Sequence, residues 1–166
     1  MFVRNDWPVF QYELEGNHNY KIEMITNMKM VYMRKIGSYG SKENFEMMKR
    51  FNKWIKQHQL NDELKEYGIY GVPQDVPGKI PSEKCRYDLM LMTNRDFSND
   101  QMVQTGHFEG GKYAVFTVTH TTEKVNLFWR QLPQMIQHNQ LNTRQVPIME
   151  RYREEEGVCE FLLPIF

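Results

Sequence analysis

Glu150 is the residue whose type and surroundings best suit a chemical role. It lies in residues 147–152, where an extended chain would alternate its side chains between two faces. Ile148 and Tyr152 then share the face of Glu150, whereas Arg151 points the other way. A carboxylate among apolar and aromatic groups attracts organic cations through its charge and the surrounding π-faces. The segment therefore indicates a binding site for an organic cation.

A plainer interpretation of the same pattern stays open. A surface strand with alternating charges would also place Glu150 here, paired with Arg151 or Lys112. The local sequence does not decide between a buried carboxylate and a solvated ion pair.

Aromatic and thioether side chains are abundant, with 9 Tyr, 10 Phe, 3 Trp and 12 Met. Many would fill an ordinary core, but thioethers beside rigid rings also suit a pocket that adapts to several ligands. Trp54 and Trp129 lie on helical stripes that could pack entirely against a sheet. The candidate ligand-binding residues are Glu150, Tyr152, Trp129, Tyr32, Tyr39, Trp54, Tyr87 and Phe116.

Residues for other kinds of chemistry are sparse. Cys85 and Cys159 are the only cysteines, without a CxxC pair or neighbouring histidines, so we expect neither a zinc site nor a disulfide. The sequence has no GxSxG motif and no phosphate-binding loop, and His107 and His120 stand alone. We therefore expect no metal and no cofactor.

Charge and hydropathy limit the partners. The 21 basic and 21 acidic residues cancel, so direct nucleic-acid binding by this chain alone is not expected. No apolar run approaches the roughly 20 residues that cross a membrane, and Arg4, Asp6 and Pro8 interrupt any signal peptide. We expect a cytoplasmic protein of one domain that does not bind membranes.

The hydrophobic periodicity predicts two similar halves. In the first, residues 19–36 are extended, residues 42–59 form an amphipathic helix, and residues 67–71 and 85–92 form strands. In the second, the pattern predicts a strand at 112–120, a helix at 123–139 that Pro133 kinks or ends, and strands at 147–152 and 158–166.

These elements predict an α+β fold of duplicated β-α-β-β units, with repeats at about residues 20–93 and 110–166. One curved antiparallel sheet would carry two helices on one side. We expect the ligand groove in the concave opposite face, with Glu150 pointing into it.

Three motifs carry a family resemblance: KCRYD at residues 84–88, GGKYAV at 110–115 and PIMERY at 147–152. In this order and spacing they resemble the gyrase-inhibitor-like (GyrI-like) effector-binding domain, found in AraC-type and MerR-type bacterial regulators and as stand-alone proteins. The resemblance covers about residues 20–166. It implies a groove between the two halves, with Glu150 as the acid that meets cationic amphipathic ligands.

Residues 1–19 resemble the stretch that joins a helix-turn-helix domain to this effector domain in AraC-type regulators. We expect a linker there, and a helix-turn-helix domain in a longer native protein is one possibility. The resemblance favours ligand sensing in transcription regulation. Two alternatives remain: a small hydrolase with Glu150 as general base, and a gyrase-modulating protein whose acidic residues 154–156 meet a protein partner.

Overall fold

The computed structural model describes residues 20–153 and 157–166. The helices are α1 (Lys42–Gln57), α2 (Asn61–Tyr67) and α3 (Thr122–His138), with a short 3-10 turn η1 (Ser82–Lys84). The strands are β1 (Tyr20–Ile25), β2 (Met28–Ile36), β3 (Ile69–Pro73), β4 (Arg86–Met92), β5 (Gln104–Phe108), β6 (Gly111–Thr119), β7 (Met149–Tyr152) and β8 (Val158–Ile165).

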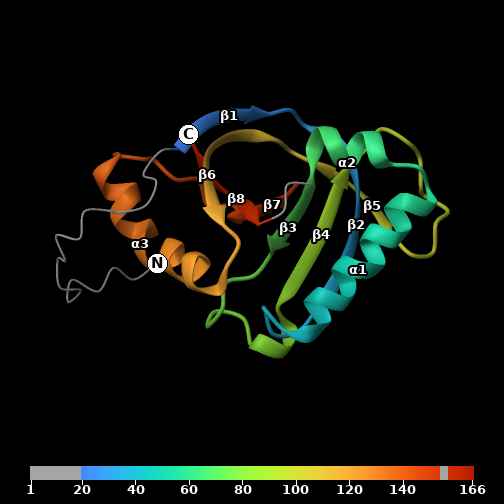
Figure 1. Ribbon diagram of the computed structural model, residues 1–166, viewed down its shortest axis with the longest axis horizontal. Helices are drawn as coiled ribbons and strands as arrows, with labels where there is room; N and C mark the ends of the chain where they lie inside the picture. The colour runs from blue at the N-terminus through green and yellow to red at the C-terminus, as the bar shows by residue number, and fades with distance from the viewer. Residues whose placement is uncertain (1–19, 154–156) are drawn as a thin grey trace.

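The strands form one eight-stranded sheet in the order β1-β6-β8-β7-β3-β4-β2-β5, and every neighbouring pair is antiparallel. The predicted α+β fold with one curved antiparallel sheet is confirmed. The strands β6-β8-β7 of one half meet β3-β4-β2 of the other through the β3–β7 pair (Figure 1). The internal duplication itself stays a prediction.

The sheet curls into a half-barrel. The ring centroids of Phe108 on β5 and Tyr113 on β6 are 6.4 Å apart, although six strand spacings separate these strands in the sheet order. In a flat sheet those spacings would add up to about 29 Å. The curl therefore brings the two ends of the sheet together around a concave interior.

Short connections impose this curl. β1 leads into β2, and β5 into β6, across only two residues each, although each connection joins opposite ends of the sheet. The connections pass so close that a side chain on Gly110 would place its Cβ 2.3 Å from the carbonyl oxygen of Ile25. Gly110 also has φ +76°, which favours glycine.

Both helices with a long apolar stripe cover the convex face. α1 packs over β2, β3 and β4, and its buried residues are Met47, Phe51, Trp54 and Ile55. α3 packs over β6 and β8, and its buried residues are Phe128, Leu132 and Met135. Figure 1 shows α3 and α1 at opposite ends, with β7, β3 and β4 between them. A third cluster fills the concave interior and includes Tyr70, Met90, Met92, Tyr113 and Leu162.

A buried ionic network closes the interior. Arg151, only 1% exposed, donates to Glu160 from Nε (2.8 Å) and to Glu23 from Nη1 and Nη2 (2.9 and 2.8 Å). Its Nη1 also donates to the hydroxyl of Tyr70 (3.2 Å). Because Glu23 is on edge strand β1 and Arg151 on β7, the network ties one end of the sheet to its centre. Arg151 is therefore not the partner of Glu150.

Some sequence predictions needed correction. Residues 20–36 form two strands, β1 and β2. The elements α2 and β5 were not predicted, because α2 has one buried residue, Leu64, and β5 none. Pro133 does not end α3, which continues to His138 with Leu132 and Met135 anchored in the core. Cys85 is buried just before β4 rather than within it. The acidic residues 154–156 lie outside the described residues. Within the described part of the chain, no helix is long and apolar enough to span a membrane.

Candidate functional site

The main groove lies between α1 and α3, on the convex face of the sheet, and has a volume of about 1350 Å³. The prediction that it would lie in the concave face opposite the helices is wrong, because the curl fills that face with the third cluster and the Arg151 network. The groove floor comes from β3, β4 and β7, where the two halves meet. Its helical walls include Asn44, Phe45, Met48 and Asn52 from α1 and Trp129 from α3.

Strand alternation on β7 delivers Glu150 to this floor. Met149 and Arg151 point into the half-barrel, so Glu150 and Tyr152 point toward the helices. Glu150 pairs across the sheet with Gly71 of β3, close to the middle of the eight strands. The carboxyl group is half-buried and lies on the floor of the groove.

The hydroxyl of Tyr152 donates to Oε2 of Glu150. Burial raises the pKa of the Glu150 carboxyl, while this hydrogen bond and the charge of His120 oppose the rise. Among the described residues, no Lys, Arg or His nitrogen lies within 4.0 Å of Glu150 in an ion pair. The plainer interpretation, a surface ion pair with Arg151 or Lys112, does not match this geometry.

Aromatic rings surround the carboxylate. Tyr87 and Tyr152 form part of the floor, and the ring centroids of Tyr39 and Tyr87 are 6.1 Å apart. Trp129 is 38% exposed and packs edge-on against Phe161 at 5.2 Å. Burial, followed by the charge of Glu150, raises the pKa of both floor tyrosines, so their hydroxyls remain protonated at neutral pH.

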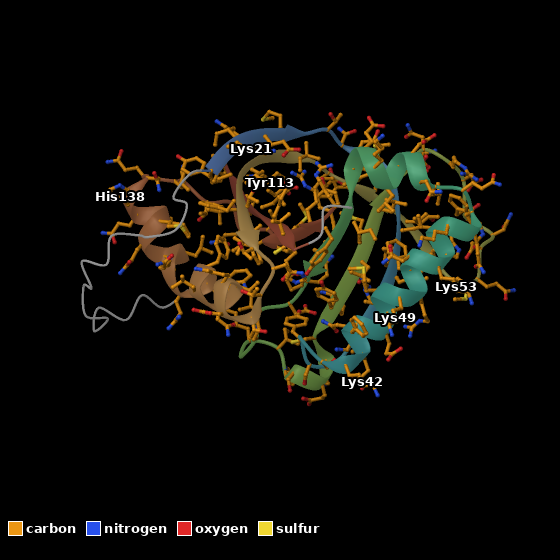
Figure 2. The ribbon with its side chains drawn as sticks, in the orientation of Figure 1. Lys21, Lys42, Lys49, Lys53, Tyr113 and His138 are labelled. Carbon is orange, nitrogen blue, oxygen red and sulfur yellow. The ribbon has the colours of Figure 1, made fainter. Side chains whose placement is uncertain are left out.

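The rim of the groove is apolar and unusually exposed. Phe45 is 61% exposed, Val76 56% and Val146 44%, and all three line the groove. The ammonium of Lys49 lies 4.6 Å from the centroid of Phe45, so this rim ring already accepts a cation from the protein. Other α1 lysines, including Lys42 and Lys53 (Figure 2), are exposed and do not line the groove.

Five of the eight candidate residues line the groove: Glu150, Tyr152, Tyr87, Tyr39 and Trp129. Trp54 and Phe116 instead are 2% and 1% exposed in the helix–sheet cores. Tyr32 lies on the concave face, where its hydroxyl donates to Gln104 (2.9 Å). The structure thus places these three away from the groove.

Sequence reasoning did not assign Gly71, Phe45 or His120 to the ligand site, although the structure puts all three at or beside the groove. The ring of His120 lies 5.5 Å from that of Tyr152. Phe45 had a usable signal, since it begins the apolar stripe of α1 before the first buried residue of that helix, Met47. In residues 20–153 and 157–166, no group of three or more His, Cys, Asp or Glu side chains is arranged to hold a metal ion.

The model of the GyrI-like small molecule binding domain matches residues 18–165. The chain belongs to this family. A relative, YosT of Bacillus subtilis (strain 168), is 42% identical over 147 residues, covering 87% of this chain and 97% of YosT. Its name describes an SPbeta prophage-derived candidate transcriptional regulator.

Solved structures share the GyrI-like fold at low identity. SAV2435 bound to tetraphenylphosphonium has a TM-score of 0.55 at 15% identity, covering 89% of this chain and 94% of that one. A hydrolase from Listeria innocua has a TM-score of 0.59 at 11% identity, covering 91% of this chain and 93% of that one. One fold thus carries both a ligand-bound protein and a hydrolase.

The placement of the tryptophans yields a prediction. Trp129→Ala should weaken binding of an aromatic cation by roughly 2- to 30-fold, the value of one cation–π contact. Trp54→Phe should leave that affinity unchanged and lower the free energy of unfolding by about 1 kcal/mol, because Trp54 Nε1 donates to Asp100 at 3.2 Å. Ligand titration and urea unfolding of both variants check this, and a large loss of affinity in Trp54→Phe would contradict the placement.

Proposed function

We propose that this chain binds lipophilic organic cations in the groove between α1 and α3, as the ligand-sensing part of a bacterial transcription regulator of the AraC type. One observation carries the proposal. Glu150 is a half-buried carboxylate on an aromatic floor, and its only hydrogen-bond donor among the described side chains is the neutral hydroxyl of Tyr152. The carboxylate therefore has no counter-charge from these side chains, and a cationic ligand can supply one.

The energetics support binding of moderate strength. Removing the carboxylate from water has a cost that an incoming cation offsets. Tyr39, Tyr87, Tyr152 and Trp129 each offer a ring face or edge, and one cation–aromatic contact contributes about 0.5–2 kcal/mol. Three such contacts and one charge pair suffice for affinity in the micromolar range. A quaternary aromatic cation satisfies both the charge and the apolar walls.

The comparisons support the same class of ligand. SAV2435, a relative in fold, binds tetraphenylphosphonium, and YosT is named for transcriptional regulation. In a regulator, a ligand acts by binding one conformation better than another. If a longer native protein carries a helix-turn-helix domain, ligand in the groove would bias how that domain is presented to DNA.

A calorimetric titration tests the proposal. Tetraphenylphosphonium should bind with micromolar affinity, and neutral triphenylphosphine oxide and anionic tetraphenylborate should each bind at least about tenfold more weakly. Equal affinity for the cation and the anion would overturn the proposal, since apolar burial alone would then account for binding.

Cation binding should depend on pH with a definite sign. Only the ionised carboxylate attracts a cation, and burial raises the pKa of Glu150, so affinity should fall as pH drops through that raised pKa. Binding should also release protons within this range, because a bound cation favours the ionised form. Calorimetry in two buffers of different ionisation enthalpy measures the release. An affinity and a number of released protons that both stay constant from neutral to acidic pH would contradict this prediction.

A second function is supported by the same carboxyl group. The raised pKa of Glu150 and the neighbouring His120 suit a general base acting on a small electrophile, which would make the chain a hydrolase. Turnover of a panel of small esters that disappears in Glu150→Gln would favour this function over sensing.

A further inference from the structure

A second cavity lies on the concave side of the sheet, at the end of the half-barrel where β1 leads into β2, and has a volume of about 690 Å³. Part of its wall is apolar and belongs to the third cluster, with Tyr70, Met92, Met28 and Ile25. Of the described residues that line it, only Arg153 also lines the groove between α1 and α3. The cavity is therefore separate from the site proposed above for organic cations.

Arg151, on the inner wall of this cavity, has no N–H group left for a ligand. It donates to both carboxylate oxygens of Glu160 (2.8 and 3.0 Å) and to both of Glu23 (2.9 and 2.8 Å). A further N–H on Nη1 donates to the Tyr70 hydroxyl at 3.2 Å. Because a guanidinium has five N–H donors, these contacts use all of them.

The Tyr70 hydroxyl, by contrast, still has a proton to donate. Arg151 offers no acceptor, so the hydroxyl is the acceptor in their hydrogen bond. In residues 20–153 and 157–166, the hydroxyl donates to no side-chain or backbone oxygen. Tyr70 is only 2% exposed, and burial raises the pKa of its hydroxyl, which keeps its proton at neutral pH. A buried donor without an acceptor is unfavourable, so this proton indicates an acceptor supplied from the cavity.

The charges around the cavity favour an acceptor that is negatively charged. Three basic side chains surround two carboxylates: Arg151, Arg153 and Lys21 lie around Glu23 and Glu160. Both carboxyl groups have a lowered pKa and are ionised at neutral pH, so this network carries one positive charge in excess. Lys29 and Glu66, the other charged side chains on the wall, offset each other. The excess positive charge therefore remains for a ligand.

We propose that this cavity binds a small carboxylate with an apolar body. One carboxylate oxygen accepts the proton of the Tyr70 hydroxyl. The side-chain amides of Asn27 and Asn94 line the cavity and have no hydrogen-bond partner among the described residues, so they are available to the second oxygen. The apolar body packs against Met28 and Met92.

A titration followed by NMR tests this site in the full, ¹⁵N-labelled chain. Sodium benzoate is added at neutral pH and constant ionic strength, with neutral benzamide as the matched probe. Benzoate should bind saturably in the millimolar range and shift the backbone amide signals of Asn27, Lys29 and Asn94. Benzamide should bind at least about threefold more weakly, because it lacks the charge. Equal affinity for the two probes would overturn the assignment to an anion.

Two phenols of the concave side provide a variant and its control. Tyr70→Phe removes the donated proton and should weaken benzoate binding by at least about tenfold, the value of one hydrogen bond to a charged group. Tyr32→Phe should retain the wild-type affinity, because that hydroxyl already donates to Gln104 at 2.9 Å. Unchanged benzoate affinity in Tyr70→Phe would overturn the role of Tyr70.

An exposed lysine keeps the test valid if Tyr70→Phe does not fold. Lys29 has no ion-pair partner within 4.0 Å among the described residues, so Lys29→Gln should leave the fold intact. It should weaken benzoate about two- to fivefold and leave benzamide unchanged. No saturable benzoate binding in wild type, or binding that saturating tetraphenylphosphonium abolishes, would overturn the second site. Tetraphenylphosphonium binding itself tests the groove, so the two proposals fail independently.

Discussion

Replacing Arg151 by alanine should lower the free energy of unfolding by about 3 kcal/mol, the lower end of the cost of breaking a buried ion pair. Arg151 is almost fully buried and makes hydrogen bonds to both carboxylate oxygens of Glu23 and of Glu160. Without Arg151, edge strand β1 would lose its tie to β7, and Glu160 would keep only Arg153 at 3.0 Å and Lys21 at 3.7 Å as basic partners among the described residues. Urea unfolding followed by circular dichroism measures the loss.

The Arg151 effect should depend on pH. The hydrogen bonds from Arg151 lower the pKa of Glu23 from its ordinary value of 4.5. For Glu160, burial acts upward, but Arg151 and Arg153 outweigh it and also leave the pKa lowered. A carboxyl group whose pKa is lowered by folding stabilises the fold at pH values above its unfolded-state pKa. This stabilisation is lost as the pH falls through the folded-state pKa. The difference in the free energy of unfolding between wild type and Arg151→Ala should therefore become smaller below about pH 4.5.

Lys21 offers a control for the Arg151 prediction. Its ammonium lies 3.7 Å from Glu160, but its side chain is 65% exposed. Lys21→Ala should therefore change the free energy of unfolding by less than about 1 kcal/mol. A similar small effect of Arg151→Ala would show that the interior network contributes little to stability.

Glu150→Gln should weaken binding of tetraphenylphosphonium by roughly 10- to 100-fold, because it removes the negative charge of Glu150 from the groove floor while keeping the shape of the side chain. The amide oxygen can still accept the hydrogen bond of Tyr152, so the floor should keep its arrangement. Titration calorimetry measures the affinity, and a change below about threefold would contradict a charge-based site.

The same substitution should not destabilise the fold at neutral pH. Burial raises the pKa of Glu150, so the folded protein binds this proton more tightly than the unfolded chain does. The Glu150 carboxyl therefore contributes its full stabilisation at pH values below its unfolded-state pKa. This contribution is lost as the pH rises through its folded-state pKa. Because glutamine does not ionise, Glu150→Gln does not suffer this loss at neutral pH. The melting temperature of the variant at neutral pH should therefore equal or exceed that of wild type. A clear decrease would indicate that Glu150 is structural.

Local periodicity was sufficient for most of the fold. The apolar spacing of α1 and the alternation of β7 are properties of neighbouring residues, and both appear in the structure. A local sequence pattern does not reveal which face of the sheet bears the groove, because that depends on how far the whole sheet curls. The partner that closes the interior, Glu23, is 128 residues from Arg151 in sequence, so no short pattern could reveal the pair.

The candidate site likewise has features that a local pattern predicted and features that depend on three-dimensional packing. Glu150 and Tyr152 were grouped by strand alternation, and both line the groove. Trp54 was ambiguous because a helical stripe does not show which residues pass beneath the sheet, and the structure stacks it on His58 at 4.4 Å in the core. The need for glycine at position 71 depends on the Tyr87 side chain of another strand occupying the adjacent space, which only three-dimensional packing shows.

The most direct test of a charge-based cation site compares two ligands in two proteins at neutral pH. Tetraphenylphosphonium and neutral triphenylphosphine oxide are each titrated into wild type and Glu150→Gln by calorimetry. We predict that the substitution weakens the cation roughly 10- to 100-fold and the neutral ligand by less than about threefold. An equal loss for both ligands, or no loss for either, would contradict the role of Glu150 as the anion that binds the cation.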